Sequence, residues 1–201
     1  MDFGGDTIGS HKSSTVIAGK TAKDELIIIA AFNQAGPNIA ERQYNWTWEQ
    51  ELRLEEIHKA LRKPYNGVIY RADKSQMTGI QFMRSSGLRV FKTKGGADSV
   101  TEGIEFVHRR LKLRPDDGAS EESKNKLRPR LYWLKGVPWV QDTLMSYRYP
   151  EPHNDGRVEA KNPLKVDDDL VDAIRYMIEG VDMHVIGDPQ QLYSSYVPRI
   201  G

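Results

Sequence analysis

The chain has 201 residues, of which 38% are hydrophobic, and this length and composition suit one globular domain with its own apolar core. Lysine and arginine total 29 against 28 aspartate and glutamate residues, so the net charge of +1 says nothing about partners and any basic surface must be local. The absence of cysteine excludes disulfides and thiolate metal sites. The longest apolar run, residues 26–32, is too short to cross a bilayer, and no signal peptide precedes it. We therefore expect an intracellular protein with no membrane partner.

The sequence alternates between β-rich and helical segments after a leading hairpin. Two β-rich runs, residues 14–20 and 25–34, are separated by only four residues, which predicts the hairpin. The other expected strands are residues 67–73, 88–94 and 130–137. The expected helices are residues 47–63, 75–87, 99–113 and 138–149, with a last helix that follows Asp167 or Asp168.

Two helices allow more detailed predictions. In the helix of residues 47–63 a set of apolar residues recurs on one side, and we expect this side to face the core. These residues are Leu52, Ile57, Ala60 and Leu61. The helix of residues 99–113 opens with Ser99 and has Glu102 three positions later, which is the pattern of a capping box.

The order of these elements predicts an α/β fold in which a mixed sheet, with its later strands parallel, carries helices on its faces. We expect one domain over residues 1–201, with a polar surface loop around 114–129 and a C-terminal tail at 181–201. Chemistry in such sheets collects at the carboxyl ends of strands. Asp73 stands at such an end, and Asp2 precedes a glycine pair near the N-terminus.

Four aspartates crowd into six positions in the segment "DDDLVD", residues 167–172. Asp167 or Asp168 can cap the last helix, and carboxylates in a first helical turn are favourable there. Asp169 and Asp172 are three positions apart and Asp168 and Asp172 are four apart, so these carboxylates can share one helix face. Capping with a solvated acidic face is one interpretation, and a group of metal ligands is the other.

Several motifs resemble, in order, the nuclease domain of the large terminase subunit of tailed bacteriophages. The segment "PLKVDDDLVDAIRY" (163–176) is similar to its C-terminal signature, and "MDFGG" to the Asp-x-Gly with which the domain opens. Residues 70–90 resemble its strand-ending aspartate with the helix and strand that follow. Residues 94–113 resemble its "Lys-x-Ser-Val-x-x-Gly-Ile" helix, and residues 144–152 resemble its "Leu-x-x-Tyr" segment. Together these motifs cover nearly the whole chain.

The resemblance implies an RNase H-like fold and an endonuclease that hydrolyses double-stranded DNA with two Mg²⁺ or Mn²⁺ ions. Hard cations prefer oxygen ligands, and a carboxylate cluster supplies them. By this resemblance Asp2, Asp73 and Asp172 are the catalytic metal ligands. Asp169 stands where many members carry histidine, and Asp168 is a supporting or alternate ligand. The five histidines are scattered along the chain, and we expect no metal pair among them.

The resemblance also implies partners and a location. We expect double-stranded DNA, an ATPase domain that this chain lacks, a small terminase subunit and a portal as partners, in the cytoplasm of a bacterium that carries the phage or prophage. Duplex DNA would meet lysine and arginine contacts to phosphate. The candidates near the acidic motifs are Lys12, Arg71, Lys74, Lys92, Lys94 and Lys165.

Three observations keep other interpretations open. Only Met1 precedes Asp2, so the strand that should carry this ligand is very short. The same "MDFGG" resembles the first phosphate loop of actin-like and sugar-kinase ATPases, which would also need a second Asp-x-Gly motif and a Gly-Gly adenosine motif. "KGGADS" (94–99) is the other glycine pair, and it precedes a helix without that second Asp-x-Gly motif. A catalytically inactive module that docks on DNA or on a portal would use the same fold with idle aspartates.

Overall fold

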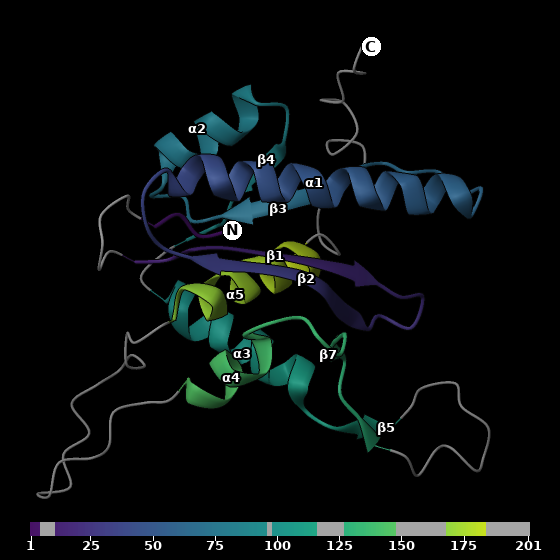
Figure 1. The fold of residues 1–201 in the computed structure, drawn as a ribbon. Coiled ribbons are helices and arrows are strands. Elements are labelled where there is room, and N and C mark those ends of the chain that lie inside the picture. Colours follow the sequence, from purple (N-terminus) through teal and green to yellow (C-terminus); the bar gives the residue numbers. More distant parts are fainter. Residues whose placement is uncertain (5–10, 96–97, 116–126, 148–167, 184–201) are drawn as a thin grey trace, which may run out of the picture.

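The structure is a computed structural model that describes residues 1–4, 11–95, 98–115, 127–147 and 168–183 (Figure 1). The strands are β1 (Ser13–Lys20), β2 (Leu26–Gln34), β3 (Ile69–Ala72), β4 (Arg89–Lys92), β5 (Arg114–Pro115), β6 (Leu127–Arg128) and β7 (Leu131–Trp133). The helices are α1 (Ile39–Ala60), α2 (Met77–Ser85), α3 (Ser99–Leu111), α4 (Val140–Ser146) and α5 (Asp169–Met183). The predicted alternation of strands and helices is confirmed.

The leading hairpin forms as the sequence predicts. β1 and β2 pair antiparallel, with Ser13 opposite Gln34 and Lys20 opposite Leu26, and a register shift interrupts the ladder between Ile17 and Ala18. β7 joins β2 in parallel, and β3 pairs in parallel with β4 as a separate two-stranded sheet. The mixed α/β class with parallel later strands is therefore confirmed.

Helices cover both faces of the strands (Figure 1). α5 packs against β1, β3 and α3, and α4 lies beside it, whereas α1 covers the other side of β1 and β2. Each face has its own apolar cluster: Val16, Leu26 and Ile174 belong to the α5 side, and Ile17 and Tyr70 to the α1 side. These two clusters hold the strands between the helices, because burial of apolar side chains is the dominant stabilising effect in folding.

The N-terminus stands between β1 and β3. Asp2 and Ser14 exchange both backbone hydrogen bonds, at 2.7 and 2.8 Å, and form an isolated antiparallel bridge. The ammonium group of Met1 donates to the carbonyl of Arg71 on β3 at 2.6 Å. The very short first strand expected from the sequence is thus a single bridge that links the two sheets.

α1 differs from its prediction in both start and orientation. It begins at Ile39, eight residues early, and buries Gln43, Thr47 and Glu51. The residues predicted to face the core are exposed instead: Leu52 by 44%, Ile57 by 52%, Leu61 by 60%, and Ala60 as well. The reason is Gln43, whose amide donates to the carbonyls of Asp2 and Ser14 and to Thr15 Oγ1 at 3.0–3.1 Å. A polar face therefore packs on the N-terminal bridge.

Smaller differences occur at other element ends. The N-cap of α3 is Asp98, which makes no side-chain capping bond, so the predicted Ser99 capping box is wrong. The ends of the expected loop 114–129 pair as the short strands β5 and β6, while residues 116–126 lie outside the described residues. α5 runs to Met183 and so includes the first residues of the expected 181–201 tail. Among the described helices, none is both long and apolar enough to span a membrane.

Candidate metal centre

The first turn of α5 presents its aspartates away from the apolar core. The Asp172 amide donates to the Asp168 carbonyl at 2.9 Å, so the helix starts directly after Asp168. Asp168 and Asp169 are buried, and the Asp172 side chain is 20% exposed. The opposite side of the helix is fully buried in the core through Leu170, Ala173, Ile174 and Ile178. The acidic face of α5 is therefore separate from its apolar stripe.

Asp73 follows β3 directly and is held by two donors. The Ser75 amide donates to Asp73 Oδ1 at 2.7 Å, and the Tyr176 hydroxyl on α5 donates to Asp73 Oδ2 at 3.0 Å. Burial works against the charge of this carboxylate, but the bonds from Ser75 and Tyr176 outweigh it and lower its pKa. Asp73 does not cap α2, whose N-cap is Gln76, so its side chain is fixed toward α5 instead.

Tyr176 is the residue around which the three predicted catalytic aspartates gather. Its pKa is raised first by burial and then by the negative charges of Asp172, Asp2 and Asp73. Asp73 and Asp172 also line one pocket of about 260 Å³, together with Tyr176 and Arg175. Carboxylates from the N-terminus, from the end of β3 and from α5 are therefore neighbours in space.

Asp2 is the most perturbed of these carboxylates. It is only 9% exposed, and its pKa is raised to about 7, first by burial and then by the charge of Asp172. A hydrogen bond from the Gln76 side chain and the nearby ammonium of Met1 act in the opposite direction. A carboxylate that titrates near neutral pH because of burial and a like charge is typical of functional sites.

Gln76 and Phe3 hold Asp2 against the loop that follows Asp73. The Phe3 amide donates to Gln76 Oε1 at 3.1 Å, and Gln76 Nε2 donates back to the Phe3 carbonyl at 3.0 Å. The Phe3 ring lies on α2 at Gly79, where a Cβ atom would come within 2.7 Å of the ring. No local pattern predicts this anchoring, because it joins segments more than seventy positions apart.

Arg175 supplies the positive charge nearest to the acidic group. It lies buried and forms an ion pair of 2.5 Å with Asp172 Oδ1. Burial alone would lower its pKa, but the charges of Asp172, Tyr176 and Tyr147 raise it. Its side chain crosses α3 at Gly103, where a Cβ atom would lie 2.7 Å from Arg175 Nε. Neither Arg175 nor Tyr176 was predicted from the sequence to be a site residue.

A second group joins the start of β1 to the start of α5. The Lys12 amide donates to Asp169 Oδ2 at 3.1 Å, and His11 Nδ1 lies 3.3 Å from Asp169 Oδ1. One ligand atom each from His11, Asp168 and Asp169 lies within 4.8 Å of the others, so these residues can hold a cation. We predicted no metal pair among the histidines, and this group contains a single histidine, which folding brings to residues far away in the sequence.

The basic residues predicted to contact DNA have different surroundings. Lys74 and Lys94 are exposed near the pocket of Asp73 and Asp172, where the Lys94 amide donates to Glu179 at 2.7 Å. Lys92 is exposed at the end of β4, and Lys12 is half-buried beside Asp169.

Arg71 and Lys165 differ from these. The Arg71 guanidinium donates to the Lys92 carbonyl at 3.1 Å and lies 5.3 Å from the Phe91 ring centre. Its side chain also packs where α5 has Gly180. Arg71 thus has a structural role at the junction of β3, β4 and α5, and Lys165 lies outside the described residues.

The two groups together offer carboxylate oxygens and one imidazole, without thiolates. Mg²⁺ and Mn²⁺ prefer oxygen donors. Burial is the main cause of the raised pKa values of Asp2 and Asp169, and neighbouring carboxylates raise them further, so a cation would relieve that repulsion. The donor set therefore fits a hard divalent cation.

Comparisons with solved structures place this fold. The structure is similar to that of the large terminase from the thermophilic bacteriophage D6E, with a TM-score of 0.57 and 16% identity, over 90% of this chain and 38% of that chain. A structure of the D6E large terminase in complex with ATP-gamma-S gives a TM-score of 0.46 and 15% identity, over 84% of this chain and 40% of that chain. No protein-family model and no curated protein matches the sequence. At this identity the first likeness shows that the described part of the chain has a fold that is also found within a bacteriophage large terminase.

Proposed function

We propose that this chain is a metal-dependent endonuclease domain of a phage DNA-packaging terminase and hydrolyses phosphodiester bonds of double-stranded DNA. The observation that carries the proposal is the gathering of Asp2, Asp73 and Asp172 around Tyr176. These carboxylates come from three separate segments, and like charges are brought together in a fold only against their repulsion. A cation explains why such an arrangement is kept.

Asp2, Asp73 and Asp172 would hold divalent cations, and Asp168, Asp169 and His11 offer further ligand atoms next to them. When bound, two such cations activate a water molecule and stabilise the leaving oxygen of a phosphodiester. Asp2 and Asp169 influence each other's surroundings, since the charge of Asp169 contributes to the raised pKa of Asp2. The two groups therefore belong to one acidic region.

The other residues of the region have positioning and charge-balancing roles in this proposal. Tyr176 fixes the rotamer of Asp73 through its hydroxyl, and partners of this kind orient metal ligands. Arg175 holds Asp172 in place and reduces the net negative charge. Lys74 lies exposed at the rim of the same pocket and is available to contact DNA phosphates.

In this role the domain would cut DNA during genome packaging in a bacterial cell. It would act with an ATPase domain, a small terminase subunit and a portal, as the resemblance to terminases implies. The likeness in fold to the D6E large terminase supports this setting, and the chain spans 38% of that structure's chain.

Cleavage of supercoiled plasmid with Mg²⁺, Mn²⁺ or EDTA tests the proposal. We expect metal-dependent nicking and linearisation by the native chain and none by Asp73→Asn or Asp172→Asn. Asp142→Asn on α4 is the matched control, because Asp142 is exposed and lies outside both acidic groups. Cleavage that survives both substitutions would refute the site.

A non-catalytic docking module is the second candidate, and the Asp172–Arg175 ion pair favours it, because an arginine already neutralises one carboxylate. In that case the native chain would bind duplex DNA equally well with Mg²⁺ and with EDTA and would never cut it. Mobility shifts in the two buffers, run beside the plasmid assay, distinguish the two functions.

A further inference from the structure

Arg175 holds a carboxylate that the proposed metal site needs. Its Nη1 atom donates to Asp172 Oδ1 at 2.5 Å, from a position one turn further along α5. A divalent cation bound to Asp172 would lie beside a guanidinium of the same sign, and like charges at this range repel each other. Arg175 and a divalent cation therefore compete for Asp172.

The guanidinium of Arg175 is buried with its hydrogen bonds incomplete. The residue is 4% exposed, and its Nε atom has no hydrogen-bond partner among the described residues. Nε faces Gly103 on α3, where a Cβ atom would lie within 2.7 Å of it, so the glycine leaves room there. A buried donor without an acceptor costs free energy. The contacts of Arg175 thus leave one donor for a further acceptor.

The pocket beside Arg175 is lined by groups that bind phosphate. It has a volume of about 260 Å³, and Arg175 forms part of its wall. The other donors in its lining are Lys74, Ser75, Thr93 and Ser99. Ammonium, guanidinium and hydroxyl groups are the side-chain groups that contact phosphate oxygens of nucleic acids. The pocket can therefore receive a phosphate group.

The carboxylates of this pocket decide when a phosphate can enter. Three carboxylates line it, against two cationic side chains. The carboxylates are those of Asp73, Asp172 and Glu179. This surplus of negative charge repels an anion, whereas a divalent cation on Asp73 and Asp172 would reverse the balance. The cation must therefore bind before the phosphate, and its binding is the step that displaces Arg175.

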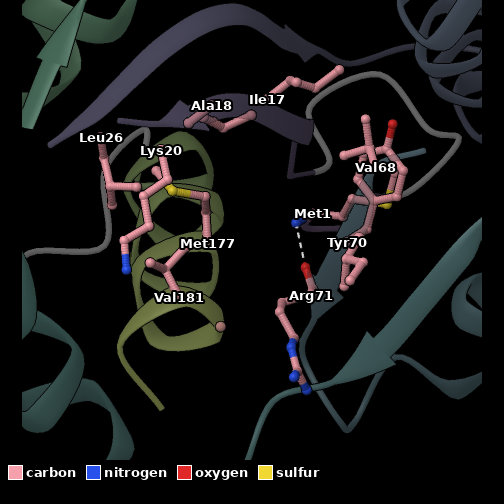
Figure 2. A pocket seen from close by; sticks show the side chains of 13 residues that line it. Met1, Ile17, Ala18, Lys20, Leu26, Val68, Tyr70, Arg71, Met177 and Val181 are labelled. Atoms are coloured by element: carbon pink, nitrogen blue, oxygen red, sulfur yellow. Dashed lines mark hydrogen bonds between the residues drawn. The ribbon is translucent and has the colours of Figure 1, made fainter. Parts of the chain in front are cut away.

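A larger cavity elsewhere does not combine these groups. It has a volume of about 350 Å³ and lies between β1, β3 and α5 (Figure 2). Most of its lining is apolar, and Lys20 and Arg71 are its charged side chains. None of the described residues that line it carries a carboxylate, so it has no ligands for a divalent cation. The pocket of Arg175 is therefore the place where a cation and a phosphate can meet.

We propose that Arg175 exchanges partners: it neutralises Asp172 until a divalent cation takes over this carboxylate, and it then binds a phosphate of the DNA strand in the pocket. The proposal rests on the proposed function, which makes Asp172 a metal ligand. Arginine suits both partners, because its planar guanidinium pairs with carboxylate and with phosphate in the same bidentate geometry. The ion pair with Asp172 is then compatible with cleavage rather than an argument against it.

Direct metal binding gives the first test. Arg175→Gln removes the competitor, so we expect it to bind Mn²⁺ about 10-fold more tightly than the native chain does, measured without DNA from the EPR signal of the free ion. Cleavage should change in the opposite direction. At saturating Mn²⁺, kcat/KM for a short duplex should fall about 10-fold to 100-fold, because a donor to phosphate is lost. A purely structural role for Arg175 would weaken both.

Arg110→Gln is the matched control for this test. Arg110 is also buried and ion-paired with an aspartate, Asp182, but it does not line the pocket. Its substitution should leave Mn²⁺ affinity and kcat/KM unchanged even where it lowers stability. Arg175→Lys keeps a positive charge and should recover part of the lost cleavage. Unchanged or weaker Mn²⁺ binding by Arg175→Gln would overturn the proposal.

A measurement on the native chain covers the case in which Arg175→Gln does not fold. The Nε–H resonance of Arg175 is followed by NMR with Ca²⁺, which also takes oxygen ligands and is not paramagnetic. We expect the resonance to move when Ca²⁺ is added and to move again when a short duplex follows. A resonance that ignores Ca²⁺, or that responds to the duplex equally in EDTA, would overturn the exchange of partners. Cleavage that survives Asp172→Asn would instead refute the proposed site itself, so the two failures are distinguishable.

Discussion

Asp2→Asn tests the idea that the acidic region is held together against its own repulsion. The pKa of Asp2 rises from 3.8 to about 7 in the folded protein because of burial and the charge of Asp172. The folded state therefore favours the protonated form of Asp2. The resulting contribution to the free energy of unfolding is complete below about pH 4 and is lost as the pH rises through 7. Three pKa units correspond to about 4 kcal/mol of unfolding free energy.

The asparagine variant lacks this pH dependence, so the two proteins should diverge between about pH 4 and pH 8. The new amide N–H groups are buried and cost about 1–3 kcal/mol at every pH. We therefore expect Asp2→Asn to be less stable than the native protein near pH 4 and more stable, by about 1–3 kcal/mol, near pH 8. Urea unfolding in EDTA across this range measures both values.

Adding Mg²⁺ at about pH 8 should reduce the advantage of the variant by up to about 1.4 kcal/mol. A ligand at about ten times its Kd adds about 1.4 kcal/mol to a protein that binds it, and the variant lacks one carboxylate ligand. Asp142→Asn should follow the native curve throughout. Parallel unfolding curves for native protein and Asp2→Asn would refute both the raised pKa and its cause.

Three other substitutions test particular contacts. Tyr176→Phe removes the donor to Asp73 and should lower the affinity for metal about 10-fold to 100-fold. In a titration of cleavage, the variant would need that much more Mg²⁺, while its urea midpoint stays unchanged. Arg110→Ala leaves Asp182 and Asp24 without their shared partner and should lower the free energy of unfolding by about 2–3 kcal/mol, measured with urea. The Arg109 side chain is half-exposed, so Arg109→Ala should lower it by less than about 1 kcal/mol. Gln43→Leu removes three hydrogen bonds at the N-terminal bridge and should cost about 1–3 kcal/mol, and a neutral result by urea unfolding would show that α1 does not hold the bridge.

Local patterns in the sequence were enough to predict most elements but not their orientation. The hairpin and the strand before Asp73 followed from short β-rich runs with clear boundaries, and the structure has both. The predicted orientation of α1 was wrong because helical spacing identifies an apolar side of a helix without showing which part of the protein that side contacts. Gln43 and Thr47 face the N-terminal bridge instead, and no local pattern reports a partner that far along the chain.

Some residues of the candidate site could also be predicted from the sequence, and others could not. Asp73 and the α5 aspartates were recognisable because each stands at the end of an element, where chemistry collects. Tyr176 and Arg175 looked like ordinary members of an amphipathic helix, and His11 like a loop residue. Their relation to the aspartates depends on the packing of α5 against β1, β3 and α3, which spacing alone does not determine.

The charges of the acidic region argue against a purely structural role. A helix cap or a solvated face would leave its carboxylates partnered or in water, with ordinary or lowered pKa values. Asp73 fits that description, since donors from Ser75 and Tyr176 lower its pKa. Asp2 and Asp169 do not: both are buried, and both have raised pKa values even with the Met1 ammonium beside Asp2 and His11 beside Asp169. Burial is the main cause of both shifts, and a divalent cation bound here would lower both pKa values because it would favour the charged carboxylates.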